Sequence, residues 1–108
     1  MAEETKVESP FACDMNSMSA AERERHGVLV RKMLGAGLER REVDSGYAFR
    51  LDGNRIALAE AAEWVSLESK CCPFFDFRID LAREGGPIWL TVAGRPGAKE
   101  FIRAEFGF

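Results

Sequence analysis

Residues 75–81 read Phe-Asp-Phe-Arg-Ile-Asp-Leu, and this strict alternation decides the fold class. Apolar side chains at every second position predict a strand with one buried face and one face in water. The turn Arg83-Glu84-Gly85-Gly86 follows, and residues 88–92 continue the apolar set at Ile88, Leu90 and Val92. The two segments are therefore expected to form an antiparallel hairpin, with Phe75 and Phe77 buried and Asp76 and Arg78 exposed.

An earlier hairpin is predicted around the turn Asp44-Ser45-Gly46. Residues 47–51 alternate, which places Tyr47, Phe49 and Leu51 on one face. Residues 38–43 are polar on both faces, as suits a solvated strand at the edge of a sheet.

Three helices are predicted between and around these hairpins. The first covers residues 20–34: Ser19 and Glu22 form a capping box before it, and Gly35 and Gly37 supply its end. The second covers residues 56–71, with Asp52-Gly53-Asn54 as its cap and Pro73 as its end. A short third helix follows residues 94–97 and can dock through Phe101, Ile102 and Phe106.

The resulting order is α-β-β-α-β-β-α. We therefore predict an α+β domain with a four-stranded antiparallel sheet and its helices on one face. The length of 108 residues suits one domain, with residues 1–10 as a flexible tail and residues 11–108 as a single α+β domain.

Composition argues against several classes of protein. The net charge of −3 offers no broad basic surface for phosphates, so no nucleic-acid partner is expected. No apolar run approaches a membrane span, and the acidic start lacks the apolar core of a signal peptide, so we expect a cytoplasmic protein. The three cysteines are an odd number and do not make a secreted disulfide framework.

The segment Glu68-Ser-Lys-Cys71-Cys72-Pro73 is the strongest candidate for chemistry. At helical spacing, Glu68 falls inside an apolar arc, with Cys71 to one side and Cys72 to the other. A carboxylate there is costly unless it is paired, hydrogen-bonded, protonated or metal-bound.

Two further residues can complete such a site. His26 lies on the apolar arc of the first helix and would face Glu68 if both helices cover the same sheet. Cys13 would join if the N-terminal segment passes near the end of the second helix, which is also the comfortable geometry for a disulfide to Cys71 or Cys72. This donor set of Cys71, Cys72, Glu68, Cys13 and His26 suits zinc or copper(I).

Other interpretations of these residues remain open. Free cysteines are often buried as small hydrophobes, so an interaction module without chemistry of its own is one alternative. A thiol oxidoreductase is another, although the negative end of a helix disfavours a thiolate. We find no established catalytic signature, such as a phosphate-binding loop or a nucleophile with an oriented base.

Assembly is predicted from Trp89, which points away from Ile88 and Leu90 toward the face that the helices leave open. An exposed tryptophan needs cover, either from residues 106–108 (Phe-Gly-Phe) or from a second subunit. We therefore expect a homodimer.

The chain resembles a family of short, uncharacterised bacterial proteins that carry a Glu-x-x-Cys-Cys-Pro-Phe segment. The resemblance covers roughly residues 11–106 and rests on residues 68–77, together with Trp89-Leu90 and Gly94-x-x-Gly97. It implies metal handling but no particular activity. The sequence thus predicts a protein that binds a soft metal ion or senses thiol-reactive species.

Overall fold

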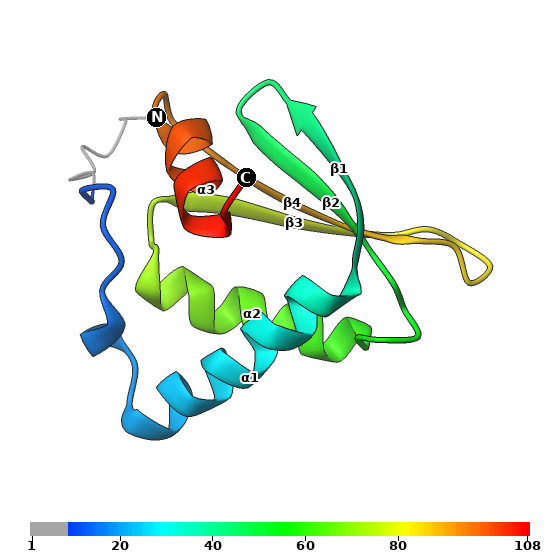
Figure 1. The fold of residues 1–108 in the computed structure, drawn as a ribbon, viewed down its shortest axis with the longest axis horizontal. Helices are drawn as coiled ribbons and strands as arrows, with labels where there is room; N and C mark the ends of the chain where they lie inside the picture. Colours follow the sequence, from blue (N-terminus) through cyan, green and yellow to red (C-terminus); the bar gives the residue numbers. More distant parts are fainter. Residues whose placement is uncertain (1–8) are drawn as a thin grey trace, which may run out of the picture.

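The computed structural model describes residues 9–108, which form one antiparallel sheet and three α-helices (Figure 1). The predicted order α-β-β-α-β-β-α is confirmed. Most of the predicted tail, residues 1–8, lies outside the described residues. A short 3₁₀ helix, η1 (Met15–Ser17), comes before the regular elements, which are α1 (Ala20–Ala36), β1 (Gly37–Val43), β2 (Gly46–Leu51), α2 (Leu58–Cys71), β3 (Phe75–Leu81), β4 (Ile88–Gly94) and α3 (Ala98–Phe106).

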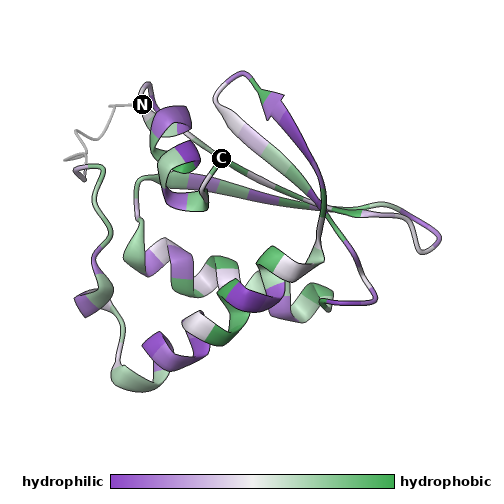
Figure 2. Cartoon of the chain, viewed as in Figure 1, coloured by the Kyte–Doolittle hydropathy of each residue, from purple (hydrophilic) through white to green (hydrophobic). Residues whose placement is uncertain are grey.

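The sheet has the strand order β1-β2-β4-β3, and all neighbouring strands are antiparallel. The register places Phe49 opposite Leu90, and Leu90 opposite Ile79, so the alternating apolar residues share one face. Phe75 is buried and Asp76 exposed, as predicted. The edge strand β1 is exposed along almost its whole length and is mostly hydrophilic in Figure 2.

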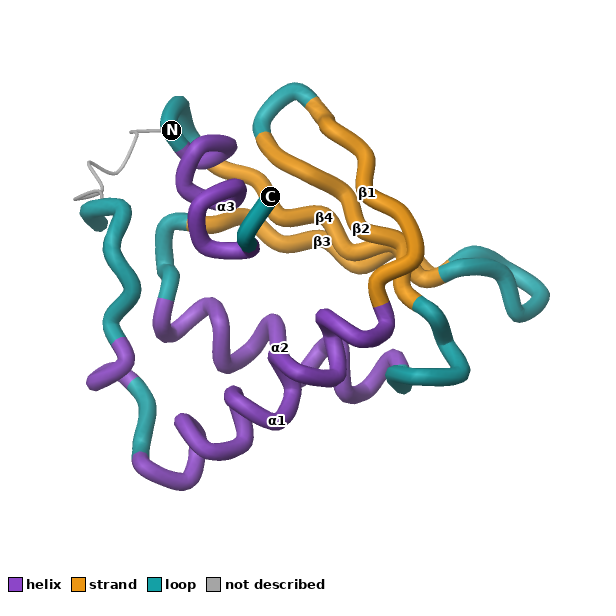
Figure 3. Tube along the Cα trace, in the orientation of Figure 1, coloured by secondary structure: helices purple, strands orange, loops and turns teal. Residues whose placement is uncertain are grey.

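The helices lie together on the apolar face of the sheet (Figure 3). Trp64 of α2 packs edge-on against Phe77 of β3, with 5.9 Å between ring centroids, and Phe106 of α3 packs against Phe49 of β2. The core between the layers also holds fully buried side chains from both halves of the chain, namely Leu29, Ile56, Leu90, Val92 and Ile102. Within residues 9–108, no helix combines the length and the hydropathy that crossing a membrane requires.

The prediction that Leu81 is buried with the other alternating apolar residues of this hairpin is wrong. Leu81 is 56% exposed, because the far end of the β3–β4 hairpin extends beyond the helix layer (Figure 1). Alternation alone does not reveal how far the helices reach along a strand.

Two helix boundaries also differ from the prediction. The first helix runs through Gly35 to Ala36, because a glycine inside a helix costs only about 1 kcal/mol and Ala36 gains complete burial. The second helix begins only at Leu58. Asp52 does not cap it, since the Asp52 side chain instead accepts from the Asn54 amide (2.9 Å) in a local turn.

The N-terminal segment is held against the end of α2. The Asp14 amide donates to the Cys71 carbonyl (2.9 Å), and the Ser17 hydroxyl donates to the Lys70 carbonyl (2.8 Å). Phe11 anchors the segment further by packing edge-on against Phe74, with 5.1 Å between ring centroids. The predicted passage of this segment beside the second helix is therefore confirmed, and it is visible in Figure 3.

Trp89 is covered by Arg41 of the edge strand β1, which lies beyond β2 from β4, rather than by the C-terminal residues. The guanidinium of Arg41 on β1 lies 4.4 Å from the centre of the Trp89 ring. Phe108 packs instead on Tyr47, on the face that the helices cover. The prediction that residues 106–108 could cover Trp89 is therefore wrong.

The homodimer stays a prediction. Light scattering of the purified protein should give about twice the 12.0 kDa mass of one chain. A mass of one chain at micromolar concentration would contradict it.

Gly46 tests the close approach of β2 and β4. A Cβ atom there would lie 2.0 Å from the Val92 carbonyl oxygen and 2.6 Å from the Ala93 Cα, both in the backbone. Gly46→Ala should therefore lower the free energy of unfolding by about 2 kcal/mol or more, as measured by urea denaturation. Gly53→Ala is the matched control, because nothing lies within 4 Å of a Cβ there. Equal stability of the two variants would contradict this register of β2 and β4.

Candidate metal centre

Three cysteine side chains meet at the C-terminal end of α2. Cys71 is the last residue of this helix and Cys72 is its C-cap, with φ −126° and ψ 72°. The non-helical conformation of Cys72 follows from Pro73, which disfavours the helical region for the residue before it. The Cys72 amide still donates to the Glu68 carbonyl (2.7 Å), so both thiols stay tied to the last turn.

The three sulfur atoms form one compact group. The Sγ atoms of Cys13 and Cys72 are 3.1 Å apart, and those of Cys72 and Cys71 are 3.8 Å apart. All three lie within 4.8 Å of one another, close enough to hold a single metal ion. Cys71 and Cys72 are buried, whereas Cys13 is exposed, so an ion can reach the group from the side of Cys13.

Two side chains border the sulfur group. The Met15 thioether sulfur lies 3.6 Å from the Sγ of Cys71, and the Cys13 thiol donates to Oε2 of Glu105 at 3.4 Å. The sequence pattern predicts neither contact. Met15 carries a weak signal, since it follows Cys13 by two residues, but nothing in the sequence indicates that Glu105 on α3 approaches a residue near the other terminus.

The surroundings hold the thiols of Cys13 and Cys72 in their protonated form. Burial of its sulfur raises the pKa of Cys13 to about 12; the neighbouring Glu105 carboxylate raises it too, and the contact with Cys72 works in the opposite direction. Cys13 is exposed as a residue, but its sulfur faces Cys72 and Glu105. Burial likewise raises the pKa of Cys72, and the contact with Cys13 and the charge of Glu68 add to that rise.

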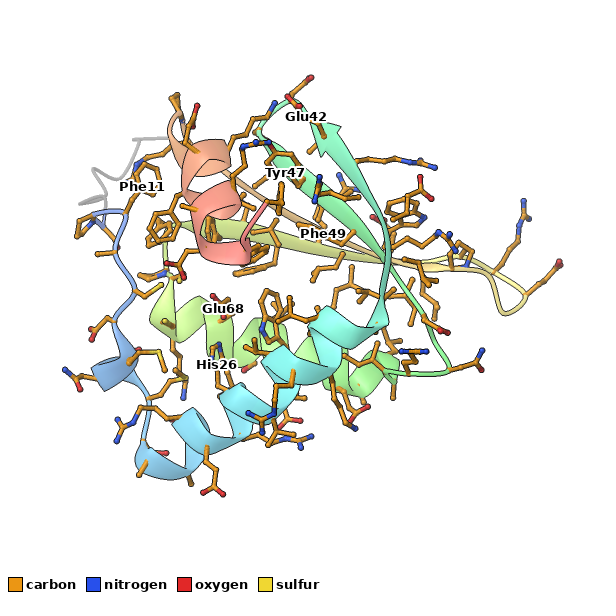
Figure 4. The ribbon with its side chains drawn as sticks, in the orientation of Figure 1. Phe11, His26, Glu42, Tyr47, Phe49 and Glu68 are labelled. Atoms are coloured by element: carbon orange, nitrogen blue, oxygen red, sulfur yellow. The ribbon has the colours of Figure 1, made fainter. Side chains whose placement is uncertain are left out.

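His26 and Glu68 form a separate pair. Nε2 of His26 lies 2.6 Å from Oε2 of Glu68, and the two residues are only 8% and 6% exposed. The predicted approach of these residues is confirmed, and Figure 4 shows them pointing toward each other between α1 and α2. In the described part of the chain, the group of potential metal ligands consists of the three cysteines and does not include His26 or Glu68.

The five predicted site residues thus fall into two neighbouring groups. Cys13, Cys71 and Cys72 come together, whereas His26 and Glu68 are each other's partners. Glu68 connects the groups, because its carbonyl accepts from the Cys72 amide and its charge acts on the Cys72 thiol.

Comparison with known proteins gives no match: no family model fits the chain, and no curated protein or solved structure is significantly similar. The family resemblance of the Glu-x-x-Cys-Cys-Pro-Phe segment therefore stays a prediction. Any functional argument rests on the geometry of these side chains.

The raised thiol pKa values predict how stability depends on pH. The folded protein keeps thiol protons that the unfolded chain releases above an ordinary cysteine pKa of 9.0. The free energy of unfolding should therefore be intact below that pH and should fall as pH rises toward the folded-state pKa of about 12. Cys13→Ser should lose less stability than the wild type as pH rises from 9.0 toward about 12, in urea denaturation of the metal-free protein. Parallel pH profiles would contradict the raised pKa of Cys13.

Proposed function

We propose that the protein binds one soft metal ion through Cys13, Cys71 and Cys72. The observation that carries this proposal is the grouping of three sulfur atoms within 4.8 Å of one another, contributed by two segments far apart in the sequence. Core packing alone does not require three thiols to face one another, and the exposed side of Cys13 leaves a route for an ion.

The donor set favours copper(I) over zinc. Thiolate and thioether sulfur atoms are the ligands that copper(I) prefers, and Met15 places a thioether next to Cys71. Zinc takes four ligands in structural sites and favours nitrogen, oxygen or thiolate as the fourth. The carboxylate of Glu105 already accepts from the Cys13 thiol and would serve that role for zinc.

His26 and Glu68 act beside the ion rather than on it in this proposal. Ligation by either residue would break their buried hydrogen bond and leave the partner unsatisfied, which is costly. The negative charge of Glu68 lies near Cys72 and favours a cation at the sulfur group.

Protonated thiols make ion binding depend on pH. A metal ion binds thiolates, so each thiol that ligates must release its proton. Affinity should therefore rise with pH, and a reducing compartment such as the cytoplasm would keep the ligands available.

Oxidation is a second candidate function, favoured by the 3.1 Å between the sulfur atoms of Cys13 and Cys72. The two thiols would lose two electrons and two protons to a peroxide and form one disulfide; hydrogen peroxide would be reduced to two water molecules, and an organic hydroperoxide to one alcohol and one water. The raised pKa values make this reaction slow, because the thiolate is the reactive form. We therefore rank sensing of thiol-reactive species and thiol oxidoreduction below metal binding, and an interaction module with purely structural cysteines last.

Copper(I) titration under reducing, oxygen-free conditions tests the proposal. The protein should take one equivalent of copper(I) from a coloured chelator and release protons as it does so. Cys13→Ser and Cys72→Ser should each weaken binding about 100-fold or more, and Met15→Leu about tenfold.

Met33→Leu is the matched control, since Met33 lies on α1 outside the sulfur group and its replacement should leave affinity unchanged. The proposal fails if neither copper(I) nor zinc is bound, or if the cysteine variants change only stability. In that case the cysteines are core residues.

A further inference from the structure

A cavity of about 780 Å³ lies between the helix layer and the sheet, apart from the sulfur group. Side chains of α1, α2, β1, β2, β4 and the C-terminal residues line it, and none of the described cysteines does. Its walls are largely apolar and aromatic, and they include Val30, Phe49, Trp64, Phe106 and Phe108. Figure 4 places Phe49 on the sheet side and His26 with Glu68 on the helix side of this space.

The mouth of the cavity is unusually apolar for a surface. Leu34 and Leu38 are 69% and 52% exposed, and both belong to the lining. Large apolar side chains that face solvent around a concave site mark it as a binding site for an apolar group.

His26 and Glu68 provide a polar wall inside the cavity. One nitrogen of His26 and one oxygen of Glu68 are used in their mutual hydrogen bond. Within residues 9–108, the second ring nitrogen and the second carboxylate oxygen have no protein partner among the hydrogen bonds, and no side-chain nitrogen or oxygen is both unpartnered and fully buried. Both atoms therefore have some accessible surface. Both residues also line the cavity.

The charges of the lining favour a cation. The lining holds three carboxylates, Glu39, Glu68 and Glu105, against one guanidinium, Arg40. Glu39 is already paired with Arg41 and Arg50, and Arg40 lies 3.8 Å from the centre of the Phe108 ring. Among the described residues, the other two carboxylates are not paired with an arginine or lysine: Glu68 contacts His26, and Glu105 contacts the Cys13 thiol.

We propose that this cavity binds an organic cation with an apolar body, such as a hydrophobic amine, ammonium or phosphonium. The apolar body lies against Trp64, Phe49 and Phe106, whose ring faces attract a positive charge. The cation lies near the open oxygen of Glu68, with Glu105 adding to the negative potential. This site does not depend on the proposed metal binding, because none of the three cysteines lines the cavity.

A pair of ions with the same shape and opposite charge tests the proposal. Tetraphenylphosphonium and tetraphenylborate differ in the sign of their charge, so an apolar cavity without charge preference would not select the phosphonium. Trp64 lines the cavity and reports occupancy by its fluorescence when Trp89→Phe removes the other tryptophan. Calorimetry of the wild-type chain gives the affinity independently.

The phosphonium should bind with one site per chain and about tenfold or more tighter than the borate. Glu68→Gln keeps the shape of the side chain and an acceptor for His26, and it should weaken phosphonium binding about tenfold. Glu24→Gln is the matched control, because Glu24 is an exposed carboxylate on α1 outside the lining and should change nothing. Cys72→Ser should also leave phosphonium binding intact.

Glu105→Gln decides the matter if Glu68→Gln does not fold, and it should weaken phosphonium binding severalfold. The proposal is overturned if the phosphonium does not bind or the borate binds as tightly. It is also overturned if the folded glutamine variants bind the phosphonium like the wild type.

Discussion

The end of α2 is the constraint on which both candidate sites depend. Pro73 stops the helix, and the last carbonyls of any helix lack partners within it. The N-terminal segment supplies two donors, the Asp14 amide to the Cys71 carbonyl and the Ser17 hydroxyl to the Lys70 carbonyl. These bonds fix the chain just after Cys13 against the cysteine pair. The sulfur group therefore follows from hydrogen bonds to the carbonyls at the end of α2, and the 3.1 Å contact between the Sγ atoms of Cys13 and Cys72 adds to them.

The buried pair of His26 and Glu68 holds the two long helices in register over the sheet. A carboxylate that is almost fully buried needs a strong partner, and the histidine ring supplies it at 2.6 Å. Such a pair is weak evidence for net stability, because desolvation offsets much of the attraction. Its consequence is positional: it sets α1 and α2 so that polar atoms face a space otherwise walled by apolar side chains.

Much of the fold follows from short-range patterns. The alternation of residues 75–81 predicts the buried face of β3 because strand geometry has a period of two, and helical spacing predicts that Glu68 and His26 face inward. Where the second helix starts does not follow, because Asp52 can satisfy either a turn or a cap, and tertiary packing decides between them. Leu81 shows the same limit, since its exposure depends on where the helix layer ends.

The cysteines of the candidate site could be predicted from the sequence, because they stand out by residue type. Met15 and Glu105 could not, because nothing in the sequence shows that the fold brings these residues to the sulfur atoms. The cavity was beyond sequence analysis altogether, because its volume depends on how side chains of several elements fail to fill the space between two layers.

Glu68, in the last turn of α2, contributes to both candidate sites through different atoms. The carbonyl of Glu68 holds the Cys72 amide, and so positions a thiol, while its carboxylate lines the cavity. Glu105 on α3 also lies beside both sites, because one of its carboxylate oxygens accepts from Cys13 and its side chain borders the cavity. Sulfur selects soft ions, whereas carboxylates and aromatic faces select organic cations, so the two proposed sites would recognise chemically distinct ligands. Glu68 and Glu105 lie beside both proposed sites, so their carboxylates would favour positively charged ligands on both sides of the turn.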